Sequence, residues 1–209
     1  MSEYKNELVP VRLSQVKSED EDPLLKKHNL YGHLPPSLFA CCPILEKLDL
    51  TGAVKLQFEL PSNLGSCCPL LKQLLLTRCK GLSGAIPQSI GDCTLLTDLD
   101  LRGCTSLSGP FPESLGALEH LRSVALSKCK GITGSLPQSI FNCESLIILW
   151  VDGCKKLTGM LPGSFNRAMQ QICVSKSKVD ASHTGGRYAQ MVVENSSRSK
   201  LKSVREVLN

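Results

Sequence analysis

Residues 93–112 read CTLLTDLDLRGCTSLSGPFP, and this stretch decides the fold because close copies of it lie on both sides. Its first half contains Leu96-x-x-Leu99-x-Leu101, and its second half is a Leu-Ser-Gly-x-apolar-Pro phrase. The first pattern occurs five times, at Leu45, Leu48, Leu50; Leu71, Leu74, Leu76; Leu96, Leu99, Leu101; Leu121, Val124, Leu126; and Leu146, Leu149, Val151. A fixed recurrence of this kind is typical of a repeat protein.

The repeat is 25 or 26 residues long. Cys79, Cys104, Cys129 and Cys154 are spaced by 25, and prolines recur at Pro35, Pro61, Pro87, Pro112, Pro137 and Pro162. One such coil cannot bury its own apolar residues, so copies must stack and share a core. Because every coil supplies leucines to that core, the chain needs few rings, and its aromatic content is only 4%.

Each repeat predicts a short strand and a return path. The Leu-x-Leu alternation indicates a strand whose leucines point inward while the residues between them face solvent. The Gly-x-apolar-Pro phrase breaks a helix, so we expect turns and short 3₁₀ segments on the return path. The sequence therefore predicts an α/β-type repeat solenoid of about five to six coils with a parallel sheet on one face.

The phrase Leu107-Ser108-Gly109-Pro110-Phe111-Pro112 and its copies resemble the plant-specific class of leucine-rich repeats, with its L-x-G-x-I-P signature. That class is found in the ectodomains of receptor kinases and receptor-like proteins. The frame Cys93-x-x-Leu96-x-x-Leu99-x-Leu101-x-x-Cys104 instead resembles the cysteine-containing class known from F-box proteins. The resemblance covers residues 29–165 and implies a leucine-rich repeat solenoid that acts in recognition or signalling.

The two ends depart from the repeat, so we expect three segments. These are an acidic, mobile segment at 1–28, the solenoid at 29–175 and a basic, disordered tail at 176–209 with a candidate helix at 199–208. Adding 25 to Leu149 gives Val174, so residues 172–174 are interpreted as a degraded sixth strand. Candidates for a partial first coil are Leu24, Leu25, Leu30, Leu34 and Leu38.

The formal net charge of +5 lies in the tail. Residues 1–28 sum to −1, residues 29–165 to +1, and residues 166–209 to +5. A nucleic-acid partner requires clustered Lys and Arg side chains for its phosphates, so the neutral body predicts none. Contact between the basic tail and an anionic membrane stays open, with a solvated end as the alternative.

The N-terminal residues and the cysteines favour a particular cellular location. No apolar stretch of signal-peptide length follows residues 1–7, and no run of 18 apolar residues occurs in the chain. Eleven cysteines without a secretory signal favour reduced thiols, so we expect a cytoplasmic protein. If the chain is a receptor fragment, the expected location becomes the cell membrane.

The four cysteines that recur every 25 residues take the position that asparagine usually holds in this family. A thiol is a small apolar group and a weak donor, which suits an interior stack. No C-x-x-C pair occurs, so we expect neither a metal site nor a cofactor. Redox sensing through an exposed Cys41, Cys67 or Cys173 is the alternative.

The residues between the inward leucines form the predicted interaction surface. Trp150 is the only tryptophan and falls at an outward position, and aromatic residues near carboxylates are common anchors of protein interfaces. The alternative is that Trp150 packs under the C-terminal segment as a cap. The candidate partner-binding residues are Asp49, Leu75, Asp98, Asp100, Arg102, Ala125, Ile148, Trp150 and Asp152.

Catalysis has little support in the sequence. None of the histidines at 28, 33, 120 and 183 shares a face with a repeated serine and aspartate. Asp98 and Asp100 lie on one exposed face, with nothing in the sequence to bury them. We therefore expect a monomeric, non-enzymatic module that binds a peptide or protein, with a fragment of a membrane receptor ectodomain as the alternative.

Overall fold

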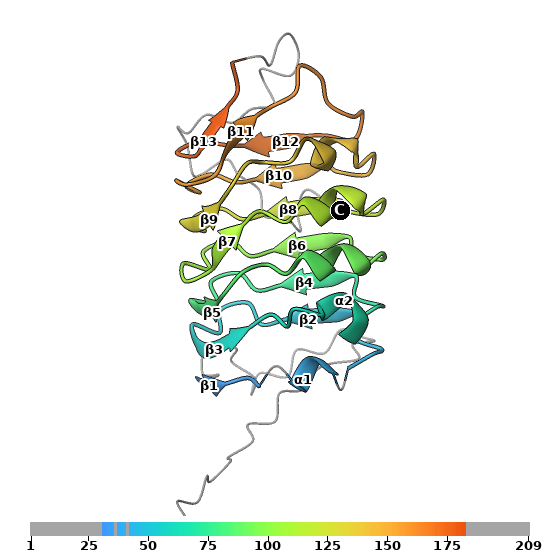
Figure 1. Ribbon diagram of the computed structural model, residues 1–209, viewed down its shortest axis with the longest axis vertical. Coiled ribbons are helices and arrows are strands. Elements are labelled where there is room, and N and C mark those ends of the chain that lie inside the picture. The colour runs from blue at the N-terminus through green and yellow to red at the C-terminus, as the bar shows by residue number, and fades with distance from the viewer. Residues whose placement is uncertain (1–30, 36, 41, 183–209) are drawn as a thin grey trace, which may run out of the picture.

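The computed structural model describes residues 31–35, 37–40 and 42–182, which wind into an elongated stack of coils (Figure 1). Successive coils each add one strand to a six-stranded parallel sheet of order β12-β10-β8-β6-β4-β2. Its strands are β2 (Lys47–Asp49), β4 (Gln73–Leu75), β6 (Asp98–Asp100), β8 (Ser123–Ala125), β10 (Ile148–Trp150) and β12 (Gln171–Cys173). The predicted parallel-sheet solenoid is confirmed.

The middle residue of every strand in this sheet points into the core. Leu74 lies beside Leu99, and Leu99 beside Val124, so residues one repeat apart are direct neighbours. All of these middle residues are buried: Leu48, Leu74, Leu99, Val124, Leu149 and Ile172. The stacked apolar ladder replaces the bulky rings of an ordinary core.

The return path contains short strands that the sequence did not predict. The phrase around the repeat glycine forms β5 (Gly81–Ser83), β7 (Ser108–Pro110), β9 (Gly131–Thr133) and β11 (Thr158–Met160). These strands and β1 (Tyr31–His33), β3 (Lys55–Glu59) and β13 (Lys178–Asp180) pair as β1-β3-β5, β7-β9 and β11-β13. They lie along one edge of the stack, at the left in Figure 1.

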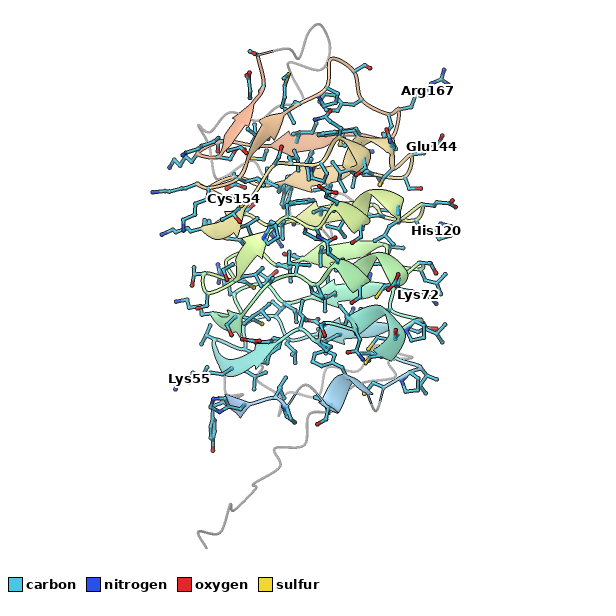
Figure 2. The ribbon with its side chains drawn as sticks, viewed as in Figure 1. Lys55, Lys72, His120, Glu144, Cys154 and Arg167 are labelled. Atoms are coloured by element: carbon cyan, nitrogen blue, oxygen red, sulfur yellow. The ribbon has the colours of Figure 1, made fainter. Side chains whose placement is uncertain are left out.

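The rest of the return path consists of turns and short helical segments; the turns and 3₁₀ segments were expected, whereas the two α-helical segments were not. The helical segments are α1 (Ser37–Ala40), α2 (Leu64–Cys67) and three 3₁₀ turns, η2 (Gln88–Asp92), η3 (Glu113–Ala117) and η4 (Gln138–Asn142). Each 3₁₀ turn follows a repeat proline, which is its N-cap residue and has an extended backbone. Figure 2 shows Lys72, His120 and Glu144 projecting outward where the chain passes from these turns to the sheet.

The last coil is two residues shorter than the repeat predicts. Leu149 pairs with Ile172, and not with Val174 as the 25-residue spacing predicts. Val174 instead follows directly after β12, as Val151 follows directly after β10. The shortening removes the 3₁₀ turn between Pro162 and Met169, where the chain forms bends and turns instead. Since β13 still pairs with β11, the expected boundary after residue 175 falls inside the last coil.

At the other end, β1 pairs with β3 and forms part of a first coil, in which Leu34 and Phe39 are buried. Leu24, Leu25 and Leu30 lie outside the described residues, as do the acidic segment and positions 183–209 of the tail. None of the helices in the described part is long and apolar enough to span a membrane.

One residue in each coil adopts a left-handed backbone just after the strand. These residues, with φ between 57° and 84°, are Gly52, Arg78, Gly103, Lys128, Gly153 and Lys176. The amide of Gly52 donates to the Thr77 carbonyl at 2.8 Å, and that of Arg78 to the Arg102 carbonyl at 2.7 Å. This turn therefore extends the hydrogen-bonded ladder beyond the strands.

Candidate protein-interaction surface

The first and third residues of the six main strands form one surface, which we call the outer face. Its members are Lys47, Asp49, Gln73, Leu75, Asp98, Asp100, Ser123, Ala125, Ile148, Trp150, Gln171 and Cys173. The register places Asp100, Ala125 and Trp150 side by side in one row. Seven of the nine expected residues lie on this face, and Arg102 and Asp152 follow two residues after β6 and β10.

Burial on the outer face changes along the stack. The residues of β2 and β4 on this face are partly exposed, whereas those of β6, β8 and β10 are buried. Ile148 is fully buried and Trp150 is only 3% exposed. The expectation that Asp98, Asp100 and Trp150 face open solvent is therefore wrong.

Neighbouring side chains explain part of this burial. Strands about 4.8 Å apart bring side chains of one row into contact. Ala125, Ile148, Trp150 and Cys173 pack together as an apolar cluster, with Ile147 at its margin. This cluster is separate from the leucine core because it lies on the opposite side of the sheet.

Arg102 connects the acidic and aromatic parts of the face. Its Nη2 donates to Asp100 Oδ2 at 2.6 Å, and its Nε donates to Asp100 Oδ1 at 2.9 Å. The guanidinium carbon also lies 5.2 Å from the centre of the Trp150 ring, within cation–π range. Arg102 thus contacts side chains of two strands, Asp100 of β6 and Trp150 of β10.

Among the residues that the structure describes, several polar atoms of the face are buried without hydrogen-bond partners. Asp98 Oδ2 accepts bonds from Gln73 Nε2 at 3.0 Å and from Thr97 Oγ1 at 2.7 Å, but Asp98 Oδ1 has none. Ser123 Oγ and Trp150 Nε1 are likewise buried and unbonded. Each such atom costs about 1–3 kcal/mol if it stays unsatisfied, so these positions favour a ligand that supplies partners.

The repeat cysteines form the predicted interior stack. Each thiol donates to the carbonyl of the coil before it, for example Cys104 Sγ to Leu76 O at 3.0 Å and Cys129 Sγ to Leu101 O at 3.0 Å. Burial raises the pKa of the Cys129 thiol to about 12, which keeps it protonated at neutral pH. The stack therefore does structural work and offers no nucleophile.

The described cysteines do not support the redox alternative. Cys67 and Cys173 are buried, contrary to the exposure that redox sensing requires, and Cys41 lies outside the described residues. Burial raises the pKa of Cys173 to about 11. Within the described ranges, no three His, Cys, Asp or Glu side chains gather closely enough to hold a metal ion.

No family model and no curated protein matches this sequence. Among solved structures, the leucine-rich repeat ectodomain of the Arabidopsis thaliana receptor kinase GASSHO1/SCHENGEN3, in complex with CASPARIAN STRIP INTEGRITY FACTOR 2, matches 70% of this chain. The identity is 30% and the TM-score 0.61. The chain folds as a leucine-rich repeat protein.

A second receptor gives the same result for the leucine-rich repeat fold. The ectodomain of the Arabidopsis receptor kinase HAESA, with an extended IDA peptide hormone, matches 70% of the chain at 28% identity and a TM-score of 0.58. HAESA with IDA and the co-receptor SERK1 matches 72% at 28% identity and a TM-score of 0.60. The alignments span only 17% to 25% of these longer chains.

Proposed function

We propose that this leucine-rich repeat protein is a non-enzymatic module that binds a protein or peptide partner on its outer face. The observation that carries the proposal is the register, which brings Asp98, Asp100, Ala125, Ile148 and Trp150 onto adjoining strands beside Arg102. Aromatic and arginine side chains in a desolvated centre, with carboxylates around them, are typical anchors of protein interfaces. Asp49, Leu75 and Asp152 extend the proposed surface.

The solved neighbours support a recognition role. The structures reported above are receptor kinases in complex with CASPARIAN STRIP INTEGRITY FACTOR 2 or with the peptide hormone IDA, in one case together with a co-receptor. We assign the repeats to the plant-specific L-x-G-x-I-P class, because their phrase also forms the short second strands of the return path. We take the solenoid to begin at residue 29 and to include β13, and we take signalling as the process that it serves.

A second candidate is that the chain is part of a membrane receptor ectodomain. The short share of each neighbour that it covers favours this reading. A cytoplasmic location finds no support in these ectodomain neighbours. It rests on the repeat cysteines Cys79, Cys104, Cys129 and Cys154, whose thiols are free. Sequencing the genomic region on both sides of the reading frame, and localising a tagged chain in cells, separates the two.

The partner-binding proposal is tested on the open part of the outer face, where substitutions leave the core intact. Proteins captured by the immobilised chain from cells that express it are identified by mass spectrometry, and each is then purified and titrated. Asp49→Lys and Leu75→Arg should weaken binding several-fold, because each places a positive charge within the proposed interface.

The matched controls carry the same changes away from the outer face. Glu119→Lys and Leu70→Arg alter exposed residues in the turns that precede β8 and β4. They should leave the affinity unchanged. If the control variants weaken binding as much as the face variants, or if the face variants bind normally, the outer face is not the binding surface.

A further inference from the structure

Six exposed lysines gather on one long edge of the solenoid. They lie between β8 and β9, between β10 and β11, and between β12 and the first residue of β13. Nitrogen-tipped side chains project from this edge beside β9 and β13 (Figure 2). We call this group the lysine cluster; its members are Lys128, Lys130, Lys155, Lys156, Lys176 and Lys178.

The stacking of the coils brings these lysines close together. The amide of Lys128 donates to the Asp152 carbonyl at 2.7 Å. The amide of Gly153 donates to the Ser175 carbonyl at 2.7 Å, so the three turns that carry the lysines are direct neighbours. Coils about 4.8 Å apart therefore place the whole cluster within about 10 Å along the stack.

The charges of the cluster are not neutralised by the coils themselves. Within the described ranges, no carboxylate forms an ion pair with a lysine of the cluster. Ion pairs form elsewhere, between Arg102 and Asp100 and between Lys72 and Glu46. Like charges this close repel one another, and a bound anion relieves that repulsion.

The opposite edge of the stack has the reverse charge. Residues 88–97, 113–122 and 138–147, which lead from the 3₁₀ turns into β6, β8 and β10, contain four Asp or Glu and one Arg. Figure 2 shows His120 and Glu144 on that edge, across the stack from Cys154. The charge of +1 over residues 29–165 is thus the sum of two edges of opposite sign.

The surroundings of the cluster limit the kind of anion that fits. Asp152 and Asp180, both at least partly exposed, border it on two sides. A flat anionic bilayer would approach these carboxylates as well as the lysines, whereas a narrow chain fits between them. Bound nucleic-acid strands stack their bases on aromatic rings, but between residues 123 and 182 the exposed large apolar side chain is that of Met160.

The cluster also adjoins the outer face over the same strands. Lys128 follows three residues after the end of β8, and Lys176 three residues after the end of β12. A protein partner on the outer face over β8, β10 and β12 therefore reaches the lysines without crossing another element. This step of the argument rests on the proposed function.

We propose that the lysine cluster binds an acidic segment of a protein partner, a short run of Asp and Glu residues. Three or four residues of extended chain, at about 3.3 Å each, cover the three coils. A lysine ammonium is a point charge on a flexible stem, so the contact selects for carboxylate charge and not for one fixed geometry.

The first measurement uses the full chain and a fluorescein-labelled synthetic peptide of alternating Glu and Ser, with fluorescence anisotropy as the readout. The peptide should bind, and its affinity should fall as sodium chloride is added, because salt screens exposed charges. The same peptide with Gln in place of Glu should not bind.

Paired substitutions place the contact on the cluster. Lys130→Gln with Lys155→Gln should weaken binding of the acidic peptide several-fold. Arg122→Gln with Arg167→Gln removes the same charge from exposed positions outside the cluster and should leave the affinity unchanged. Circular dichroism verifies that both double variants stay folded.

The absence of binding by the native chain, or equal binding by the two double variants, overturns the proposal. Tighter binding of an oligothymidylate, or of vesicles of phosphatidylcholine and phosphatidylserine in equal parts, also overturns it, because the cluster would then serve another class of anion.

The outcomes for the cluster and for the outer face can be told apart. If the acidic peptide binds the lysines but no partner binds the outer face, the cluster stands as a separate site and the proposed function fails. If a partner binds the outer face and Lys130→Gln with Lys155→Gln leaves its affinity unchanged, the proposed function stands and the acidic-segment contact fails.

Discussion

Arg78 and Lys128 occupy a backbone conformation that other coils assign to glycine. Their φ angles are 64° and 67°, and the equivalent residues Gly52, Gly103 and Gly153 have φ between 74° and 84°. A left-handed conformation costs a side-chain-bearing residue about 1–2 kcal/mol. Glycine avoids this strain, although it loses about 0.5–1 kcal/mol through the greater freedom of its unfolded state.

Arg78→Gly and Lys128→Gly should therefore each stabilise the protein, by about 0.5–1 kcal/mol as the difference of those two effects. The measurement is urea unfolding followed by circular dichroism. Lys130→Gly is the matched control, because Lys130 is exposed and has an ordinary negative φ, and it should destabilise. Equal effects at all three positions would contradict the assignment of strain to Arg78 and Lys128.

Cys104 and Trp150 show which kinds of burial the sequence could and could not predict. The repeat position of Cys104 predicted its burial, because spacing alone places it in every coil. The burial of Trp150 was not predicted, since alternation only says which side of a strand a residue faces and not what lies against that side. A signal was present: the outward residues change from Lys47 and Asp49 to Ala125, Ile148 and Cys173 along the stack.

At the scale of elements, the second row of strands depends on close approach between coils. A Cβ added to Gly131 would lie 2.3 Å from the Leu107 carbonyl oxygen and 3.1 Å from Ser108 Cα, both backbone atoms that cannot move aside freely. Gly81 meets the Leu56 carbonyl at the same distance. Glycine at this position lets β9 pair with β7, and β5 with β3.

Gly131→Ala should separate β7 from β9 and cost about 1–3 kcal/mol, the range for overpacking. Lys130→Ala, one residue earlier and exposed, is the control and should change stability by less than about 0.5 kcal/mol. Chemical unfolding gives both values, and hydrogen exchange of the Phe111 amide, which donates to the Thr133 carbonyl at 3.1 Å, reports the local separation. Unaltered exchange at Phe111 would mean that the coils absorb the added methyl.

The main sheet was predictable and the return-path strands were not, for one physical reason. The Leu-x-Leu alternation has a period of two, which specifies a strand directly. The Leu-Ser-Gly phrase has no alternation, so its strand character arises only when two coils pair. The two-residue shortening of the last coil was also missed, because strict addition of 25 assumes that every coil has a full return path.

At the scale of the whole molecule, the buried thiols make the free energy of unfolding depend on pH in the alkaline range. Burial raises the pKa of Cys79, Cys129 and Cys154 to about 12, and it also raises the pKa of Cys104. Unfolded thiols ionise near pH 9, so between pH 9 and 12 the folded chain binds more protons than the unfolded chain. Folding is then increasingly disfavoured as pH rises, whereas below pH 9 the contribution is fully present.

The free energy of unfolding should fall above pH 9 by about 1.4 kcal/mol per pH unit for each such thiol. Urea midpoints measured between pH 8 and 10.5 in reducing buffer give the slope. Cys129→Ala removes one thiol and should make the slope shallower, even though it also lowers stability at pH 7. Leu121→Val keeps every thiol and should lower stability at all pH values without altering the slope. If the free energy of unfolding falls with pH equally for Cys129→Ala and the native chain, the Cys129 thiol does not contribute to the alkaline transition. The interior stack would then stabilise the fold through packing alone.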